Sequence, residues 1–181
     1  MKFPLQAIMV SVVLLVFMTG CTIPEETEQK YSTSQHTSST EELLLTQANL
    51  EQLEVTNNTS CKTERYATAA YSPLAQYSIC FFNSSKDNTE IVIELKKYTN
   101  TQDLNGSFQY ESLHLRGFEG LISENTYGDQ SRFYVNNESA TYYYHLWIAK
   151  DYFLIHVTSK GSEEAKDDIT AIGEMILAKV K

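Results

Sequence analysis

The chain has 181 residues, of which 42% are hydrophobic, and it carries a formal net charge of -9 at pH 7. This length provides for one domain of ordinary size rather than two. The negative charge argues against nucleic acid as a partner, because an acidic surface repels phosphate backbones.

Residues 1–20 have the organisation of an export signal. Lys2 gives a positive start, residues 5–17 are almost wholly apolar, and small residues precede Cys21. The stretch resembles the prokaryotic lipoprotein signal, in which the cysteine is lipidated and becomes the new N-terminus. The resemblance implies a signal peptide over 1–20, lipid attachment at Cys21, and a protein held on the cell membrane, facing outside the cytoplasm. The alternative is an uncleaved anchor, since the run approaches the ~18–20 residues that span a bilayer.

Residues 21–39 are rich in Glu, Gln, Ser and Thr and have few apolar side chains. Such a segment buries too little surface to order itself, so we expect a flexible polar tether. Residues 40–181 are then expected to form a single domain.

Two cysteines remain once Cys21 is assigned to lipid. An even pair in an exported domain indicates a disulfide between Cys61 and Cys80, with two buried thiols as the alternative. Sequons that could accept N-linked glycans begin at five positions, Asn57, Asn58, Asn83, Asn105 and Asn137.

The first part of the expected domain combines a helix with strands. Ser39 and Glu42 have the spacing of a capping box, and leucines follow at helical spacing, which predicts a helix over 40–54. Alternating apolar and polar residues then predict antiparallel strands around 77–81 and 91–95. A further strand is expected over 65–71, a helix over 101–115, and strands over 121–126 and around 133–135.

The last part predicts a hairpin followed by a helix. Residues 142–149 and 152–158 are β-rich and flank Lys150 and Asp151, which would form a two-residue turn. In that register His145 lies opposite His156, on the face away from the core. A helix with an apolar stripe follows Gly161, with Glu163 and Glu164 in its first turn and Lys179 and Lys181 in its last.

Together these elements predict an α+β fold. We expect an antiparallel sheet of about six to seven strands, with N-terminal, middle and C-terminal helices packed on it. The Gly128-Asp129-Gln130-Ser131 turn, the aromatic hairpin and the terminal helix resemble small uncharacterised prokaryotic cell-surface lipoproteins, in particular archaeal ones. The layout over 89–181 is also similar to the PsbP/Mog1-like fold. Neither resemblance implies a catalytic residue.

His145 and His156 are the first candidates for a site. Residues opposite each other on paired strands have Cβ atoms ~5 Å apart, close enough for two imidazoles to hold one metal ion. The sequence offers no further ligand at diagnostic spacing, and the alternative is two packed, half-buried histidines. Tyr143 and Trp147, with Tyr142, Tyr144 and Tyr152, could instead form an aromatic platform for sugars or apolar ligands.

These features favour a non-enzymatic, lipid-anchored surface protein that binds an unknown protein or small ligand or supports an envelope complex, with no cofactor. The alternatives are a small-ligand or metal-binding protein that uses the aromatic and histidine face, and a hydrolase. Asp129 and Ser131 are the residues that could suggest hydrolysis, but no Gly-x-Ser-x-Gly elbow is present. We expect them to shape a turn through bonds to the local backbone.

Overall fold

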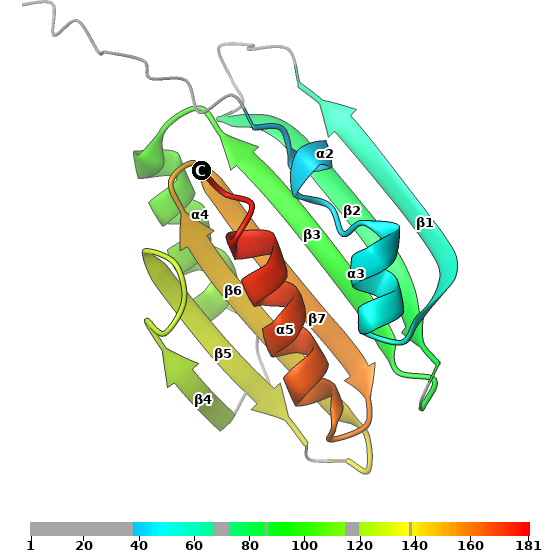
Figure 1. The fold of residues 1–181 in the computed structure, drawn as a ribbon. Helices are drawn as coiled ribbons and strands as arrows, with labels where there is room; N and C mark the ends of the chain where they lie inside the picture. The colour runs from blue at the N-terminus through cyan, green and yellow to red at the C-terminus, as the bar shows by residue number, and fades with distance from the viewer. Residues whose placement is uncertain (1–37, 67–72, 86, 115–119, 138) are drawn as a thin grey trace, which may run out of the picture. The chain divides into compact units, whose positions relative to one another are not determined.

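The computed structural model describes residues 38–66, 73–85, 87–114, 120–137 and 139–181. Their strands form one seven-stranded sheet in which every neighbouring pair is antiparallel, in the order β1-β2-β3-β7-β6-β5-β4. The strands are β1 (Val55–Arg65), β2 (Leu74–Ser84), β3 (Glu90–Tyr98), β4 (Gly120–Glu124), β5 (Gln130–Asn136), β6 (Tyr142–Lys150) and β7 (Phe153–Gly161). This sheet, with its N-terminal, middle and C-terminal helices, confirms the predicted α+β class (Figure 1).

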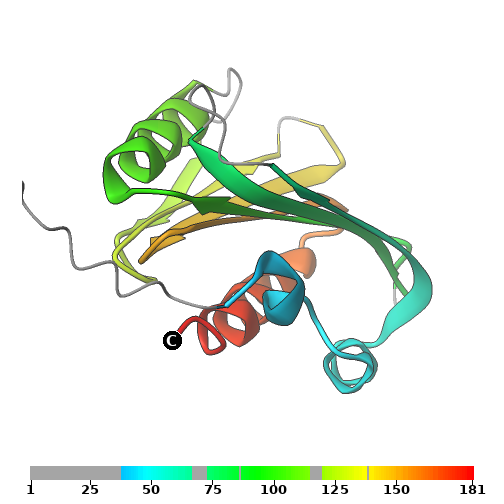
Figure 2. The same cartoon turned by 90° about the horizontal axis from the view of Figure 1, so that it is seen from above.

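Helices lie on both faces of the sheet. The short helices α2 (Thr40–Leu43) and α3 (Gln47–Gln52) share one face with α5 (Ala165–Leu177), and α4 (Thr101–Leu113) lies on the other (Figure 2). The larger hydrophobic core lies on the α5 side and includes Ile93, Leu146, Ile155 and Ile169. A smaller core lies under α4 and consists of Tyr98, Leu104, Phe108, Trp147, Ala149 and Leu154.

Strand alternation decides which side chains reach each face. In β3, Ile91, Ile93 and Leu95 are fully buried, whereas Val92 and Glu94 between them are only partly buried. Because successive side chains point to opposite faces, an apolar residue on the α5 side alternates with a residue on the α4 side. The α4 side can therefore carry polar groups without placing them in the main core.

The expected single helix over 40–54 is wrong. Its start is confirmed, because Ser39 and Glu42 form the reciprocal capping box. The helix ends after Leu43, however, since Leu44 has an extended ψ of 152°. Thr46 then caps a second helix by accepting a bond from the Asn49 N–H. Because Thr46 caps a new helix, the first helix does not continue through it. Both short helices lie on the α5 side of the sheet (Figure 2).

The predicted register of the last hairpin is also wrong. The turn residues are Asp151 and Tyr152, and Lys150 pairs with Phe153. Asp151 adopts a left-handed φ of 54°, and its N–H donates to Asp129 over 3.0 Å. The pairing moves by two residues, so every side chain keeps its predicted face and changes its partner. His145 now lies opposite Thr158 instead of His156.

Smaller differences concern the ends of elements. The last helix ends at Leu177, so Lys179 and Lys181 lie beyond it, and its first turn holds Asp167 and Asp168 instead of the two glutamates. The first strand runs over Val55–Arg65, earlier than the predicted 65–71, and residues 67–71 lie outside the described part. The signal, Cys21 and the tether up to residue 37 also lie outside it.

The predicted disulfide is present. Cys61 and Cys80 lie opposite each other on β1 and β2, with Cα atoms 4.2 Å apart and a sulfur–sulfur bond. Cys80 is fully buried in the larger core, whereas Cys61 is exposed. The bond therefore ties the edge strand β1 to the sheet.

Candidate functional site

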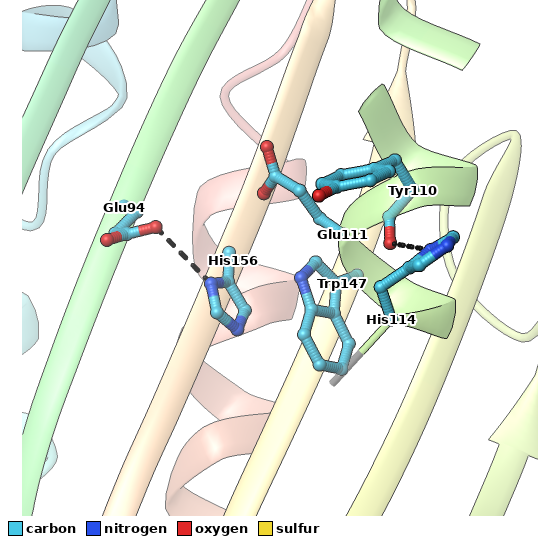
Figure 3. Close-up of a pocket in the computed structure, with 6 residues that line it drawn as sticks. All are labelled: Glu94, Tyr110, Glu111, His114, Trp147 and His156. Atoms are coloured by element: carbon cyan, nitrogen blue, oxygen red, sulfur yellow. Dashed lines mark hydrogen bonds and ion pairs between the residues drawn. The ribbon is translucent and has the colours of Figure 1, made fainter. Parts of the chain in front are cut away.

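A pocket opens on the α4 side of the sheet, at the C-terminal half of α4. It has a volume of about 320 Å³ and is lined by Glu94, Tyr110, Glu111, His114, Trp147 and His156 (Figure 3). These residues come from β3, β6, β7 and α4, with His114 as the C-cap residue of α4. Because α4 connects β3 to the far edge strand β4, it crosses this face of the sheet and brings its own side chains to the strand residues.

The strand residues of the pocket form a row across the sheet. His156 lies directly opposite Glu94 of β3 on one side and opposite Trp147 of β6 on the other. Opposed residues on the same face of a sheet have neighbouring side chains, so this row follows from the strand register alone. The row joins a carboxylate, an imidazole and an indole at the base of the pocket.

A chain of hydrogen bonds runs through this row. The Tyr77 hydroxyl donates to Glu94 Oε1 over 3.2 Å, and His156 Nδ1 lies 3.3 Å from Glu94 Oε2. His156 Nε2 lies 3.1 Å from Nδ1 of His145. An ionised carboxylate only accepts, so His156 donates to Glu94 from Nδ1. When His156 is neutral, its Nε2 accepts the proton of His145 Nδ1.

Burial keeps His145 uncharged. It lowers the pKa of His145 to about 3, the charge of His156 acts in the same direction, and Glu94 opposes them. The hydrogen bond from His156 lowers the pKa of Glu94 despite its partial burial. Burial and the nearby Glu94 raise the pKa of Tyr77. Near neutral pH, this row of hydrogen-bonded side chains therefore contains an ionised Glu94 and a neutral His145.

Trp147 forms the base of the site under the two histidines. Its side chain is 1% exposed, and its ring stacks on His156 with centroids 4.4 Å apart and on His145 at 5.2 Å. Tyr134 meets its edge at 6.1 Å. These contacts fix the orientation of the His156 ring between Trp147 and Glu94.

The wall of the pocket comes from α4. Tyr110 and His114 stack with ring centroids 4.5 Å apart, and Tyr110 is 65% exposed. The Glu111 carboxylate accepts from Lys96 Nζ over 2.6 Å, and Lys96 also lies 4.0 Å from Glu94. His114, the C-cap residue of α4, follows Tyr110 by four positions and Glu111 by three, the spacings at which side chains are neighbours on a helix.

The predicted site residues are only partly brought together. His145 and His156 are in contact, but the aromatic platform does not form as one surface, because strand alternation places Tyr142 and Tyr144 on the α5 side. Tyr143 stays on the α4 side, opposite Lys160. Trp147 is too buried to act as a platform.

The histidines contact each other directly, through ring nitrogens 3.1 Å apart. Among the described residues, no three His, Cys, Asp or Glu side chains are grouped so that they could hold a metal ion. The two histidines form a hydrogen-bonded pair, and the Glu94 carboxylate orients the His156 ring.

Sequence reasoning missed Glu94, Tyr110 and Glu111 as members of the site. Glu94 is a polar residue on a strand whose other face is apolar, which was a usable signal. The α4 residues had none, because nothing local indicates which strands a helix will cross. His114 also lines the pocket.

Asp129 and Ser131 shape a turn, as expected. Asp129 accepts from Lys150 Nζ over 2.8 Å and from the Asp151 N–H. Ser131 Oγ accepts from the N–H groups of Thr126 and Tyr127, both over 2.9 Å. Both side chains are therefore engaged by the local chain.

The five sequons differ in their structural setting. Asn57 and Asn58 lie in β1, Asn83 lies in β2, and Asn105 lies in α4, where its side chain accepts from Gln130 over 2.9 Å. Asn137 is exposed and follows the end of β5, so it is the sequon asparagine that lies outside helix and strand among these five.

The structure is similar to the extracellular domain of PknH from Mycobacterium tuberculosis, with a TM-score of 0.51 and 7% sequence identity. The match covers 75% of this chain and 93% of that chain. At this identity the likeness shows a shared fold alone. No protein-family model and no curated protein sequence matches the chain. These comparisons do not support the expected archaeal or PsbP/Mog1-like resemblance.

No helix within the described ranges is both long and apolar enough to cross a membrane. The predicted signal segment over 1–20 lies outside those ranges.

Proposed function

We propose that this chain is a non-enzymatic surface protein, held outside the cytoplasm by a lipid on Cys21, which binds a small ligand in the pocket beside α4. The pocket is the observation that carries the proposal, because it combines about 320 Å³ of space with ionisable and aromatic side chains at its walls. Ligand pockets generally have ~300–1,000 Å³ and a few convergent polar groups. A pocket of this size suits a small molecule.

Several features of the site favour binding over catalysis. Both ring nitrogens of His156 are engaged, one by Glu94 and the other by His145. A general base would present one nitrogen to a nucleophile or to the substrate. The buried stack of His156 on Trp147 instead supports a rigid base for the pocket. The negative charge of the chain favours a ligand other than nucleic acid.

Binding is expected to change the fluorescence of Trp147, which is the only tryptophan of the chain and lines the pocket. Titration of the full protein with a panel of small metabolites should give a saturable change for at least one of them. Mass spectrometry should recover that compound chemically unchanged after prolonged incubation. A compound recovered as a reaction product would reject the non-enzymatic role, and a panel without any saturable response would reject the binding role.

The lipid anchor follows from the sequence before and including Cys21. The similarity to an extracellular domain supports an address outside the cytoplasm. We expect the wild-type protein to partition into detergent and to carry a lipid on Cys21, whereas Cys21→Ser should remain unlipidated. Mass spectrometry of the mature N-terminus from isolated membranes measures this. An intact Met1 on the membrane-bound protein would favour the uncleaved anchor instead.

A further inference from the structure

The charge of the pocket indicates the chemistry of its ligand. The described residues that line it include two glutamates and no lysine or arginine. Lys96 reaches the same carboxylates from beside the pocket, 2.6 Å from Glu111 and 4.0 Å from Glu94. One ammonium therefore faces two carboxylates, so the side chains of Glu94, Glu111 and Lys96 together carry one net negative charge.

This charge is only partly screened by water. The side chains of Glu94, Glu111 and Lys96 are 27%, 26% and 19% exposed. Charges at such sites interact more strongly than on an open surface, because the effective dielectric constant is lower than that of water. A ligand that brings a positive charge to the pocket would be favoured over a neutral ligand of the same shape.

Glu111 is better placed than Glu94 to meet a ligand. Both oxygens of Glu94 already have partners, the Tyr77 hydroxyl and His156 Nδ1. On Glu111, the bond from Lys96 reaches Oε1. A carboxylate has about four acceptor positions, so Glu111 can accept a further donor or counter-charge.

Aromatic rings adjoin the same carboxylate. Tyr110 precedes Glu111 on α4, exposes most of its side chain and stacks on His114, and all three line the pocket. Trp147 and His156 lie at the base of the same pocket (Figure 3). A cation near an aromatic face is attracted by the ring quadrupole, and proteins use aromatic side chains in this way to bind quaternary ammonium groups.

We infer that the pocket beside α4 takes a small organic cation, a protonated amine or a quaternary ammonium, with Glu111 as its counter-charge and Tyr110 as its aromatic wall. This inference rests on the proposed binding function and names its ligand class. The volume of about 320 Å³ is at the lower end of the range for ligand pockets, so the ligand is a small molecule.

The test compares two probes of the same shape. Choline carries a quaternary ammonium, and 3,3-dimethyl-1-butanol replaces the charged nitrogen by carbon. Trp147 fluorescence of the full wild-type protein in detergent should titrate with choline and respond at least tenfold more weakly to the neutral alcohol. This comparison uses the wild-type protein only, so it does not depend on the folding of a variant.

Two variants test whether Glu111 is the counter-charge for choline. Glu111→Gln should weaken choline binding about tenfold. Glu124→Gln is the matched control, because Glu124 also pairs with one cation, Arg132 at 2.9 Å, but does not line the pocket. It should bind choline like the wild type. Equal binding of both probes, or unchanged choline binding by Glu111→Gln, would reject the inference that the pocket binds a cation through Glu111.

The outcomes separate this inference from the proposed function. If choline gives no response but glucose or another neutral compound gives a saturable Trp147 signal, the binding function stands and the cation is rejected. If no probe gives a saturable signal, both proposals are rejected.

Discussion

Acidification from pH 7 to pH 4 is expected to lower the free energy of unfolding by about 3 kcal/mol through His145 alone. The folded protein holds the pKa of this imidazole at about 3, below the ordinary value of 6.5 that applies to the unfolded chain. Between these values the unfolded chain binds one more proton than the folded protein. Stability is therefore highest above pH 6.5 and is lost progressively as the pH falls toward 3.

Protonation of Glu94 is expected to lower the free energy of unfolding further, beginning at a lower pH than the loss through His145. Its folded pKa lies below the ordinary 4.5, so its contribution is present above pH 4.5 and is lost as the pH falls through the folded value. His156 links the two groups by hydrogen bonds, so acid should weaken the side-chain contacts between β3, β7 and β6.

Urea unfolding of the wild type and of His145→Asn between pH 4 and 7 measures the effect. Asparagine can keep a hydrogen bond to His156 but cannot take up the proton. The slope of stability against pH should be smaller in the variant by up to ~1.4 kcal/mol per pH unit. His114→Asn is the matched control, because His114 is exposed and bonds to the backbone of its own helix. Equal slopes in wild type and His145→Asn would contradict the prediction.

Reduction of the disulfide is expected to lower the free energy of unfolding by about 3 kcal/mol. The cysteines are 19 residues apart, and a cross-link over a loop of this length restricts the unfolded chain by about that amount. Without the bond, β2 is the one strand that holds β1 to the sheet, because β1 is an edge strand. Its pairing with β2 already contains a register shift between Thr56 and Ser60.

Denaturant unfolding of the same protein with and without a reducing agent measures this loss. Reduction leaves both sulfur atoms in place, so the buried Cys80 does not create a cavity. The double variant Cys61→Ala, Cys80→Ala should be less stable than the oxidised wild type and should not respond to the reducing agent. An unfolding midpoint that is the same in oxidised and reduced wild type would show that the bond adds no stability.

Local patterns predicted a large part of the fold. The alternation in 77–81 and 91–95 identified two strands of the sheet, and the apolar stripe through Ile169 and Ile172 identified the last helix. The cap at Ser39 was found because its two partners are three residues apart. Where a competing cap followed at once, at Thr46, the same reasoning gave one helix instead of two.

The faces of the last hairpin were predicted more reliably than its pairing. Side chains alternate with a period of two, so a shift of two residues leaves His145 and His156 on the same face. The turn that sets the pairing depends on Asp129, which is more than twenty residues away from its partner Asp151 in the chain. The register therefore required the tertiary structure.

By itself, the sequence determined the local features of this protein: its elements, the polar face that carries the two histidines, the cysteine pair, and a signal that predicts its address. These depend on residues close together in the chain. Only the tertiary structure decided the site. Glu94 meets His156 because β3 pairs with β7, 62 residues later, and Glu111 reaches them because α4 crosses that part of the sheet. Such contacts depend on how helices and strands pack to bury both cores, and packing is a property of the whole chain.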